Sequence, residues 1–496
     1  MPFDPSILMP HQQVMKDFIV QRPFCAIWLP VGGAKSLTTL AALSEIRPSG
    51  HILVIAPKAI ARSSWFSEVE KWGFPLRMKS LVVDERDRLL SAAKRKAIYE
   101  EFFSAPPTMY FIGKDLLDDL VNSMPTRKYG RQESILWPFP TVIIDESQEF
   151  KNPTSVRFKA LRKVRPAIVR LIELTGTPAP QSLLDVWSQI YLLDQGLALG
   201  QRYTDFRKLY FKEPRIVNGR PAGKWEIHPW AEAVIHERIK HLVLSAENTS
   251  VPLPPVTYET VEIELPEHVQ SAYRTFKREQ VLELATPDPK NPDTLIITAD
   301  NAAILRGKLL QFASGTLYTG EDHGNDFVQV HEVKLLELEK IVASQPAGDP
   351  LLVAYRFQSD QKIIPTYLLA RGYQTEVFDG SKAMIDRWNR REIPVMLLQP
   401  ASFGRGLNIQ HGSRDLVWFT LPDSLEQWIQ TVGRLRRIGQ AGTVRVRSMI
   451  TKHTVDEKQP SLLSRKKLTQ DALLEAVRVE VKDDLALLNN GALAPG

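Results

Sequence analysis

Short apolar runs alternate with longer polar or amphipathic stretches over the first part of the chain. Four such runs, each bounded by proline, glycine or charge, occupy residues 25–30, 51–57, 109–113 and 141–146. Strand-like runs that alternate with helical patterns predict a parallel sheet covered by helices on both faces. The first part of the chain is therefore predicted to fold as an α/β domain.

A second set of apolar runs appears late in the chain and predicts a second α/β domain of the same kind. These runs occupy residues 349–355, 373–380, 393–400, 414–422 and 442–450. Between the two sets, from about residue 183 to residue 333, the patterns are mostly helical. Three stretches rich in proline, glycine or asparagine interrupt them, at residues 216–224, 250–256 and 285–294.

The fold predicted from these patterns is α/β, with two parallel-sheet domains and a mainly helical insert between them. We expect the first sheet domain over residues 1–190 and the helical insert with its linker over 191–330. The second sheet domain is expected over 331–482, followed by a flexible tail over 483–496.

Composition narrows the class of protein. Hydrophobic residues make up 43% of the 496 residues and charged residues 24%, which is typical of a soluble globular chain without membrane spans. The single cysteine, Cys25, excludes internal disulfides and a cysteine-based zinc site. No secretory signal is visible, so a cytoplasmic setting is expected. A net charge of +6 permits a polyanionic partner.

The stretch LPVGGAKSLTTLAAL, residues 29–43, predicts a strand, a glycine turn and a helix. In such a turn, backbone N–H groups and the helix N-terminus bind phosphate, while Lys35 supplies charge and Ser36 a magnesium ligand. The strict phosphate-loop pattern fails, because Leu29 and Ala34 occupy its two glycine positions. The alternative interpretation is a glycine-rich turn that carries a surface lysine.

Two adjacent glycines, Gly32 and Gly33, precede Ala34. An L-residue tolerates positive φ poorly, whereas glycine adopts it readily. We therefore expect the glycines to form the bend and Ala34 to keep a negative, helix-like φ.

An apolar run ends in the acidic pair Asp145-Glu146 about a hundred residues after the lysine. One carboxylate of such a pair can hold Mg²⁺, and the other can activate the attacking water. A solvated strand end is the alternative. The hydroxyl-rich turn Thr175-Gly-Thr-Pro178 follows a further apolar run.

The order of these motifs resembles that of superfamily-two helicases, and within them the Swi/Snf-type DNA translocases. LMPHQQ (8–13) resembles the entry motif that reads adenine, and ILVIAPKAIARSSWFSEVEKW (52–72) resembles the segment that follows it. DESQEFKNPTS (145–155) and LTGTPAP (174–180) are similar to the acidic and coupling motifs. VFDGS (377–381), ASFGRGLNIQ (401–410) and QTVGRLRRIGQ (430–440) follow in the family's order.

The last of these motifs is the most specific. The spacing Gln430-x-x-Gly433-Arg434-x-x-Arg437 matches the family's arginine-finger motif, and the ending RIGQ is typical of the Swi/Snf branch. Arginine fingers neutralise charge on the transferring phosphoryl group.

The resemblance implies two RecA-like domains that use ATP and Mg²⁺, and it assigns roles to individual residues. The catalytic residues would be Asp145, Glu146, Lys35, Arg434 and Arg437. Glu146 would activate water, and both arginines would reach across from the second domain. The nucleotide would contact Gln12, Gly32, Gly33, Ala34, Lys35, Ser36, Gly406 and Gln430, and Mg²⁺ would be held by Ser36 and Asp145. Gln148, Thr175 and Thr177 would couple the ATP state to movement, and DNA would contact Lys58, Lys151, Asn152, Gly406, Asn408 and Gln410.

The function expected from the resemblance is that of an ATP-dependent motor that moves on duplex or forked DNA and remodels it. Its DNA contacts would carry little sequence preference. We expect a monomer, without membrane contact, in the cytoplasm of a bacterium or of a phage-infected cell. Two alternatives stay open: a strand-separating helicase, and a DNA-binding module whose turnover Ala34 has impaired.

Overall fold

The computed structural model comprises two compact units, Met1–Leu253 with Gly404–Leu407, and Pro254–Phe403 with Asn408–Gly496. The boundary at Leu253 lies inside the stretch predicted as a helical insert, and the predicted domain limits stay predictions. The structure describes residues 3–30, 32–57, 65–86, 88–129, 132–176, 178–179, 182–213, 215–217, 220–222, 225–245, 252–288, 291–319, 326–400 and 408–460.

The first unit is built on a seven-stranded sheet in which all neighbouring strands are parallel. In spatial order the strands are β13 (Val243–Ser245), β1 (Phe24–Trp28), β8 (Arg170–Thr175), β7 (Thr141–Asp145), β2 (Ile52–Ala56), β4 (Met109–Gly113) and β3 (Met78–Ser80). Four of them, β1, β2, β4 and β7, are the predicted apolar runs. Because successive side chains of a strand point to opposite faces, Val142 and Ile144 enter one core and Ile143 the other.

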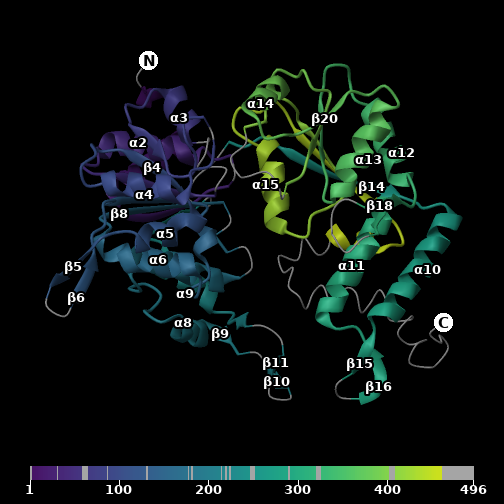
Figure 1. Ribbon diagram of the computed structural model, residues 1–496, viewed down its shortest axis with the longest axis horizontal. Coiled ribbons are helices and arrows are strands. Elements are labelled where there is room, and N and C mark those ends of the chain that lie inside the picture. The colour runs from purple at the N-terminus through teal and green to yellow at the C-terminus, as the bar shows by residue number, and fades with distance from the viewer. Residues whose placement is uncertain are drawn as a thin grey trace. The chain divides into compact units, whose positions relative to one another are not determined.

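Helices cover both faces of this sheet, as Figure 1 shows for α2 and α3 on one side and α5 and α6 on the other. One face packs against α1 (Pro10–Gln21), α2 (Lys35–Ile46) and α3 (Trp65–Trp72). The other packs against α4 (Ala92–Glu101), α5 (Leu117–Asn122), α6 (Val156–Val164), α7 (Val186–Asp194), α8 (Tyr203–Tyr210) and α9 (Ala231–Ile239).

The second unit has a six-stranded parallel sheet. Its spatial order is β14 (Val256–Ile263), β23 (Val444–Thr451), β22 (Asp415–Trp418), β19 (Leu351–Ala354), β21 (Val395–Leu398) and β20 (Thr375–Val377). The accompanying helices are α12 (Val333–Ala343), α13 (Gln358–Leu369), α14 (Lys382–Asn389) and α15 (Leu425–Leu435). The prediction of an α/β fold with two parallel sheets is confirmed.

Helices α10 (Glu267–Leu284) and α11 (Ala299–Ser314) of the second unit pack side by side around a small core of their own (Figure 1). Two of the three predicted breaks are hairpins, since residues 216–224 overlap β10–β11 and residues 285–294 overlap β15–β16. The short strands are β5 (Thr126–Tyr129), β6 (Gln132–Ile135), β9 (Phe211–Lys212), β10 (Arg215–Val217), β11 (Arg220–Ala222), β12 (Glu226–Ile227), β15 (Thr286–Asp288), β16 (Asn291–Ile296), β17 (Thr316–Tyr318) and β18 (Phe327–Gln329). Over the described residues, none of the helices has both the length and the apolar character of a membrane span.

Candidate nucleotide-binding site

Three neighbouring strands of the first unit bring the predicted ATP motifs to one edge of the sheet. The order β1-β8-β7 is parallel throughout, so the loop after β1, Thr175 at the end of β8 and Asp145 at the end of β7 share the carboxyl edge. The register places Trp28 opposite Thr175. Ligands of open parallel α/β sheets bind at this edge.

The loop after β1 bends at two residues. The Gly33 N–H donates to the Pro30 carbonyl oxygen over 3.1 Å, and Gly32 has a φ of 88°. Ala34 then adopts φ 54° and ψ 35°, the left-handed helical region, at the N-cap of α2. The expectation of a negative φ at Ala34 is therefore wrong. One glycine at positive φ does not complete the bend, and the alanine adopts the conformation that glycine would adopt without strain.

Lys35 closes the loop through its ammonium group. Its Nζ donates to the carbonyl oxygen of Leu29 over 2.8 Å and to that of Pro30 over 3.1 Å. The Thr38 hydroxyl donates to the Ala34 carbonyl over 3.0 Å and fixes the first turn of α2. The structure thus holds the lysine against the same loop that the sequence assigns to phosphate.

Helix α2 begins directly after this loop, and its N-cap residue Ala34 makes no side-chain cap hydrogen bond. Its dipole favours an anion at this point. Ser36 lies in the first turn and is half-buried. The predicted phosphate contacts Gly32, Gly33, Ala34, Lys35 and Ser36 therefore form one continuous segment.

The acidic motif follows β7. The Trp65 indole N–H donates to Oδ2 of Asp145 over 3.0 Å. Trp65 is the first residue of α3 and also belongs to the buried core on that face of the sheet. Glu146 has a φ of 62°, a second non-glycine residue in the left-handed region at this edge. Backbone outliers of this kind cluster at functional sites.

A hydrogen-bond chain links the acidic motif to the predicted coupling motif. The Gln148 amide donates to Oε2 of Glu146 over 2.8 Å, and the Thr175 hydroxyl donates to Oε1 of Gln148 over 2.5 Å. Gln148 lies in the 3₁₀ turn η4 (Ser147–Phe150) and is buried, as is Thr175. The structure thus brings together two of the three predicted coupling residues with Glu146.

The donor set at this edge fits a magnesium ion. A hydroxyl from Ser36 and a carboxylate from Asp145 are hard oxygen ligands, and Mg²⁺ in nucleotide sites takes its other ligands from phosphates and water. Among the described residues, no group of three or more His, Cys, Asp or Glu side chains could hold a metal ion by itself. The residues present therefore suit a magnesium ion that arrives with a nucleotide.

Glu173 is a buried carboxyl group that the sequence analysis did not single out. It lies in β8, two residues before Thr175, and its side chain is fully buried. Burial raises the pKa of Glu173 well above its usual value, and the nearby Arg165 and Ser147 only partly oppose the shift. Ser147 donates its hydrogen bond to Gln189 and not to the carboxyl group. Burial beneath the site therefore favours the neutral, protonated form of Glu173.

Gln12, the predicted adenine reader, is buried in the first turn of α1. Its Oε1 accepts the Met9 N–H over 2.8 Å and thereby caps the helix. Pro10 occupies the first helical position, where its missing N–H does no harm. The bond fixes the direction of the carboxamide group, and the adenine role stays a prediction.

Two predicted DNA-contacting residues of the first unit, Lys151 and Asn152, lie shortly after the acidic pair. Lys151 is half-buried, with Nζ at 3.9 Å from Oδ2 of Asp185. Asn152 is exposed and turns the chain, because its Oδ1 accepts the backbone N–H of Thr154 over 2.9 Å. Lys58, Thr177 and Gly406, three further predicted site residues, lie outside the described residues.

The predicted residues of the second unit meet one another at the end of α15. Arg437 donates from Nη1 to Oδ1 of the exposed Asn408 over 3.3 Å. The Gln440 amide donates to the carbonyl oxygen of Gln410 over 2.7 Å. This contact explains the glutamine that ends the RIGQ motif, because it ties the two late motifs together.

Arg434 and Gln430 lie within α15 itself. Arg434 is buried, and the Gln430 amide donates to Oε1 of Glu426 over 3.2 Å, one turn earlier. Of the two predicted finger arginines, Arg437 thus contacts the predicted DNA-contacting Asn408, whereas Arg434 lies buried within α15.

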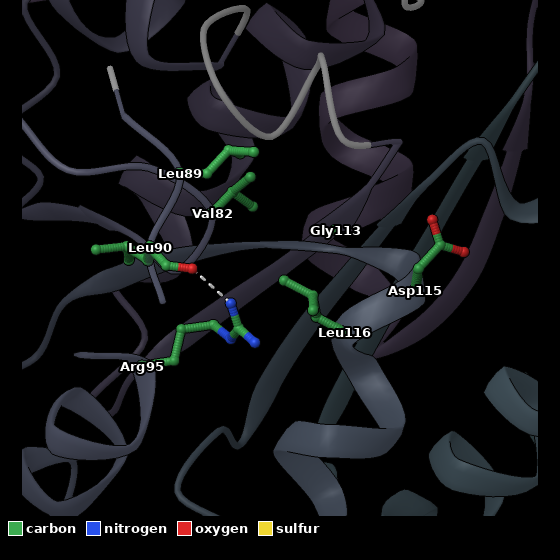
Figure 2. A pocket seen from close by; sticks show the side chains of 7 residues that line it. All are labelled: Val82, Leu89, Leu90, Arg95, Gly113, Asp115 and Leu116. Carbon is green, nitrogen blue, oxygen red and sulfur yellow. Dashed lines mark hydrogen bonds between the residues drawn. The ribbon is translucent and has the colours of Figure 1, made fainter. Parts of the chain in front are cut away.

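A small cavity of about 180 Å³ lies elsewhere in the first unit and contains none of the predicted site residues (Figure 2). Arg95 at its rim donates from Nη1 to the Leu90 carbonyl oxygen over 2.7 Å. Drug-sized ligands occupy pockets of roughly 300–1,000 Å³, so this cavity does not suit a nucleotide. Its lining residues are Val82, Leu89, Leu90, Arg95, Gly113, Asp115 and Leu116.

Trp65, Glu173 and Gln189 are the site residues that sequence reasoning missed. Trp65 lies in the core, and nothing in the sequence indicates that its indole N–H has a carboxylate partner. Glu173 offered the one available signal, a charged residue inside the apolar run LIELT. Gln189 sits in a helical pattern that predicts no partner.

The match to a family model covers the motifs of the first unit from the glycine loop onward. The sequence profile described as "SNF2-related domain" matches residues 31–305, more than half of the chain. A protein named "Putative protein p41" of Acyrthosiphon pisum secondary endosymbiont phage 1 is 29% identical over 485 residues, which is 95% of this chain and 98% of that protein. The "Putative ATP-dependent helicase/translocase YwqA" of Bacillus subtilis is 23% identical over 69% of this chain and 36% of its own length.

Other relatives are longer proteins. "Chromodomain-helicase-DNA-binding protein 1-like" of Danio rerio is 23% identical over 92% of this chain, which spans 43% of that protein. Among solved structures, the "Sulfolobus solfataricus SWI2/SNF2 ATPase core in complex with dsDNA" aligns over 98% of this chain and 95% of its own, with 19% identity and a TM-score of 0.40.

Proposed function

The chain belongs to the SNF2-related family, and on that premise we propose that it is a DNA-dependent ATPase that uses ATP hydrolysis to move along duplex or forked DNA and to remodel it. One observation supports this most directly. The hydrogen-bond chain Glu146–Gln148–Thr175 joins the carboxylate beside Asp145 to the strand end next to the Lys35 loop. Glu146, the carboxylate proposed to activate water, is thereby linked through Gln148 to Thr175, which is proposed to couple the ATP state to movement.

In this proposal the first unit binds the nucleotide phosphates. The segment from Gly32 to Ser36 offers backbone N–H groups and the positive end of α2 to the phosphates. Lys35 exchanges its carbonyl contacts with Leu29 and Pro30 for the stronger charge of a phosphate. Gln12 adds a contact with the base.

The acidic pair divides two tasks. Asp145 and Ser36 would hold Mg²⁺, which when bound supplies charge neutralisation at the phosphate oxygens. Glu146 orients and deprotonates the attacking water, while Gln148 holds one of its carboxylate oxygens in place. Arg434 and Arg437 of the second unit contribute positive charge to the transferring phosphoryl group.

DNA contact would use Lys151 and Asn152 in the first unit and Asn408 and Gln410 in the second, together with Lys58 and Gly406. These polar groups suit the sugar–phosphate backbone and would give salt-dependent binding without sequence preference. The phage relative, which this chain matches over nearly its full length, supports work inside a bacterial cell. We infer a monomer.

ATP hydrolysis rates without DNA, with single strands, with duplex and with forked DNA test the proposal. We expect turnover that duplex or forked DNA stimulates, and its loss in Glu146→Gln with ATP affinity retained, because an amide cannot act as a base. Glu149→Gln is the matched control: Glu149 lies in η4, the 3₁₀ turn that Glu146 caps, but pairs with Lys114 and Arg157. A duplex-unwinding assay with a labelled strand separates translocation from strand separation.

A second candidate is a DNA-binding module with impaired turnover. The positive φ of Ala34 favours it, because an L-residue in this conformation strains the loop proposed to bind phosphate. Absence of turnover in every arm of the panel, with DNA binding intact, would establish this candidate and exclude the motor.

A further inference from the structure

Two consecutive polar side chains of α7, Ser188 and Gln189, are fully buried. A buried polar group is costly unless it is hydrogen-bonded, so a helix rarely carries two in succession without partners. Both side chains have partners outside their own turn. These partners lie in the acidic motif, in the segment after it and in the coupling turn.

Gln189 bonds with both ends of its carboxamide. Its Oε1 accepts the hydroxyl of Ser147 over 2.7 Å, and its Nε2 donates to the Pro178 carbonyl oxygen over 2.7 Å. Ser147 directly follows Glu146, and Pro178 ends the Thr175-Gly-Thr-Pro178 turn. A single side chain therefore connects the backbone beside the proposed catalytic carboxylate with the coupling turn.

Ser188 bonds in a different direction. Its hydroxyl donates to the carbonyl oxygen of Lys151 over 2.9 Å, at the start of the segment proposed to contact DNA. Through two adjacent residues, helix α7 thus contacts Ser147, Pro178 and the backbone of Lys151. A displacement of the Lys151 segment would be transmitted through this helix to Ser147 and to Pro178.

We propose that Gln189, through Ser147, is a positioning residue that makes hydrolysis at Glu146 respond to DNA; this inference rests on the proposed function. Glu146 has a left-handed backbone, so the direction of its side chain depends on how the next peptide is held. The Ser147–Gln189 bond holds that residue from one side, while Gln148 holds the carboxylate from the other.

A control variant of a neighbouring residue can distinguish the proposed positioning role of Gln189 from a purely structural role. Trp187 belongs to the same helix, is also buried, and donates from Nε1 to the Gly200 carbonyl oxygen over 3.1 Å. This bond leads away from the acidic and coupling motifs. Trp187→Phe therefore removes one buried hydrogen bond from α7 and leaves the proposed link intact.

The experiment uses the full chain with four variants: Gln189→Met, Ser147→Ala, the double variant and Trp187→Phe. ATP affinity, duplex affinity without ATP, thermal unfolding, and ATP turnover with and without duplex DNA are measured for each. Ser147→Ala removes a single hydroxyl group and no carbon atom, so it decides the matter if Gln189→Met does not fold.

We expect Gln189→Met and Ser147→Ala to lower DNA-stimulated kcat by roughly tenfold to a hundredfold, because misplacement of a catalytic group by about 1 Å has effects of this size. Both binding affinities should stay within about twofold of those of the wild type, since no ligand contact is removed. The double variant should be no slower than the slower single variant, because both changes break one link. Trp187→Phe should lose thermal stability but keep its DNA-stimulated kcat.

A folded Ser147→Ala protein that keeps its DNA-stimulated kcat within about twofold of the wild type overturns the inference. An equal loss of kcat in Trp187→Phe overturns it as well, because the effect would then follow stability alone. In both cases the wild type is still stimulated by DNA and the proposed function stands. A wild type whose turnover is unaffected by DNA contradicts the proposed function itself, and the inference falls with it.

Discussion

The indole N–H of Trp65 donates a hydrogen bond of 3.0 Å to Oδ2 of Asp145. The two residues are 80 positions apart, and the bond joins the start of α3 to the end of β7. Outer-sphere partners of this kind orient the carboxylates that hold metal ions. The relationship therefore predicts a role for Trp65 in magnesium use, in addition to its place in the core.

Trp65→Phe should keep most of the ring packing but lose the donor. We expect the magnesium concentration for half-maximal ATP turnover to rise by about tenfold, the lower end of the effect of removing such partners. Trp72→Phe is the control on the same helix, because its indole N–H donates to Oε2 of Glu68 over 2.8 Å. An unchanged magnesium requirement in Trp65→Phe would show that Trp65 contributes to core packing and not to magnesium use.

Arg437→Lys tests the proposed role of Arg437 as an arginine finger. Lysine keeps the charge but lacks the planar fork, so ATP should still bind while hydrolysis falls by roughly 10³-fold. Arg436→Lys is the adjacent control, since Arg436 donates from Nε to the Pro254 carbonyl oxygen over 3.1 Å. Single-turnover hydrolysis measures both variants. A loss of only about twofold in Arg437→Lys would limit Arg437 to its contact with Asn408.

The two parallel sheets could be predicted because buried parallel strands appear as continuous apolar runs. The runs at residues 51–57 and 141–146 became β2 and β7, and parallel pairing then placed the motifs at one edge without further information. The hairpin β15–β16 was recognised only as a break. Its proline and asparagine residues indicate a turn but not the pairing of the flanking residues.

The contacts within the site could not be predicted in this way. Trp65–Asp145 and Ser147–Gln189 join residues 80 and 42 positions apart. Such pairs depend on how a helix packs on the sheet, which local pattern does not determine. The positive φ of Ala34 escaped prediction for a related reason. Sequence gives the number of glycines in a loop, whereas the direction of the following helix decides which residue must turn.

Glu173→Gln tests the buried carboxyl group in β8. Burial raises the folded-state pKa of Glu173 above the usual value of about 4.5, so the folded protein keeps a proton that the unfolded chain releases. This group's contribution to stability is therefore fully present below the unfolded pKa. It is lost as pH rises, by about 1.4 kcal/mol per pH unit until the folded pKa is passed.

Glutamine has the same shape and does not titrate. The free energy of unfolding of Glu173→Gln, compared with that of the wild type, should therefore be relatively higher at pH 8 than at pH 5. Denaturant unfolding across this range measures the difference, with Glu100→Gln on the exposed surface of α4 as the control. Parallel pH profiles for Glu173→Gln and the wild type would show that Glu173 is ionised in the folded protein.

Ala34→Gly addresses the phosphate loop. At φ 54° the alanine has a left-handed conformation, which costs an L-residue roughly 1–2 kcal/mol and glycine almost nothing. Glycine also costs about 0.5–1 kcal/mol through the entropy of the unfolded chain, so the net gain in folding free energy should lie between about zero and about 1.5 kcal/mol.

Arg47 provides the matched control for this change. It ends the same helix α2 with φ 50° and ψ 65°, so Arg47→Gly relieves the same kind of strain at the far end of α2 from the phosphate loop. Both variants should gain similar thermal stability. Only Ala34→Gly should also tighten ATP binding, by about three- to fivefold if up to 1 kcal/mol of loop strain opposes the bound conformation. Equal ATP affinities in the wild type and both variants would show that the strain at Ala34 is the same with and without nucleotide, and that the natural loop binds ATP as well as one with glycine.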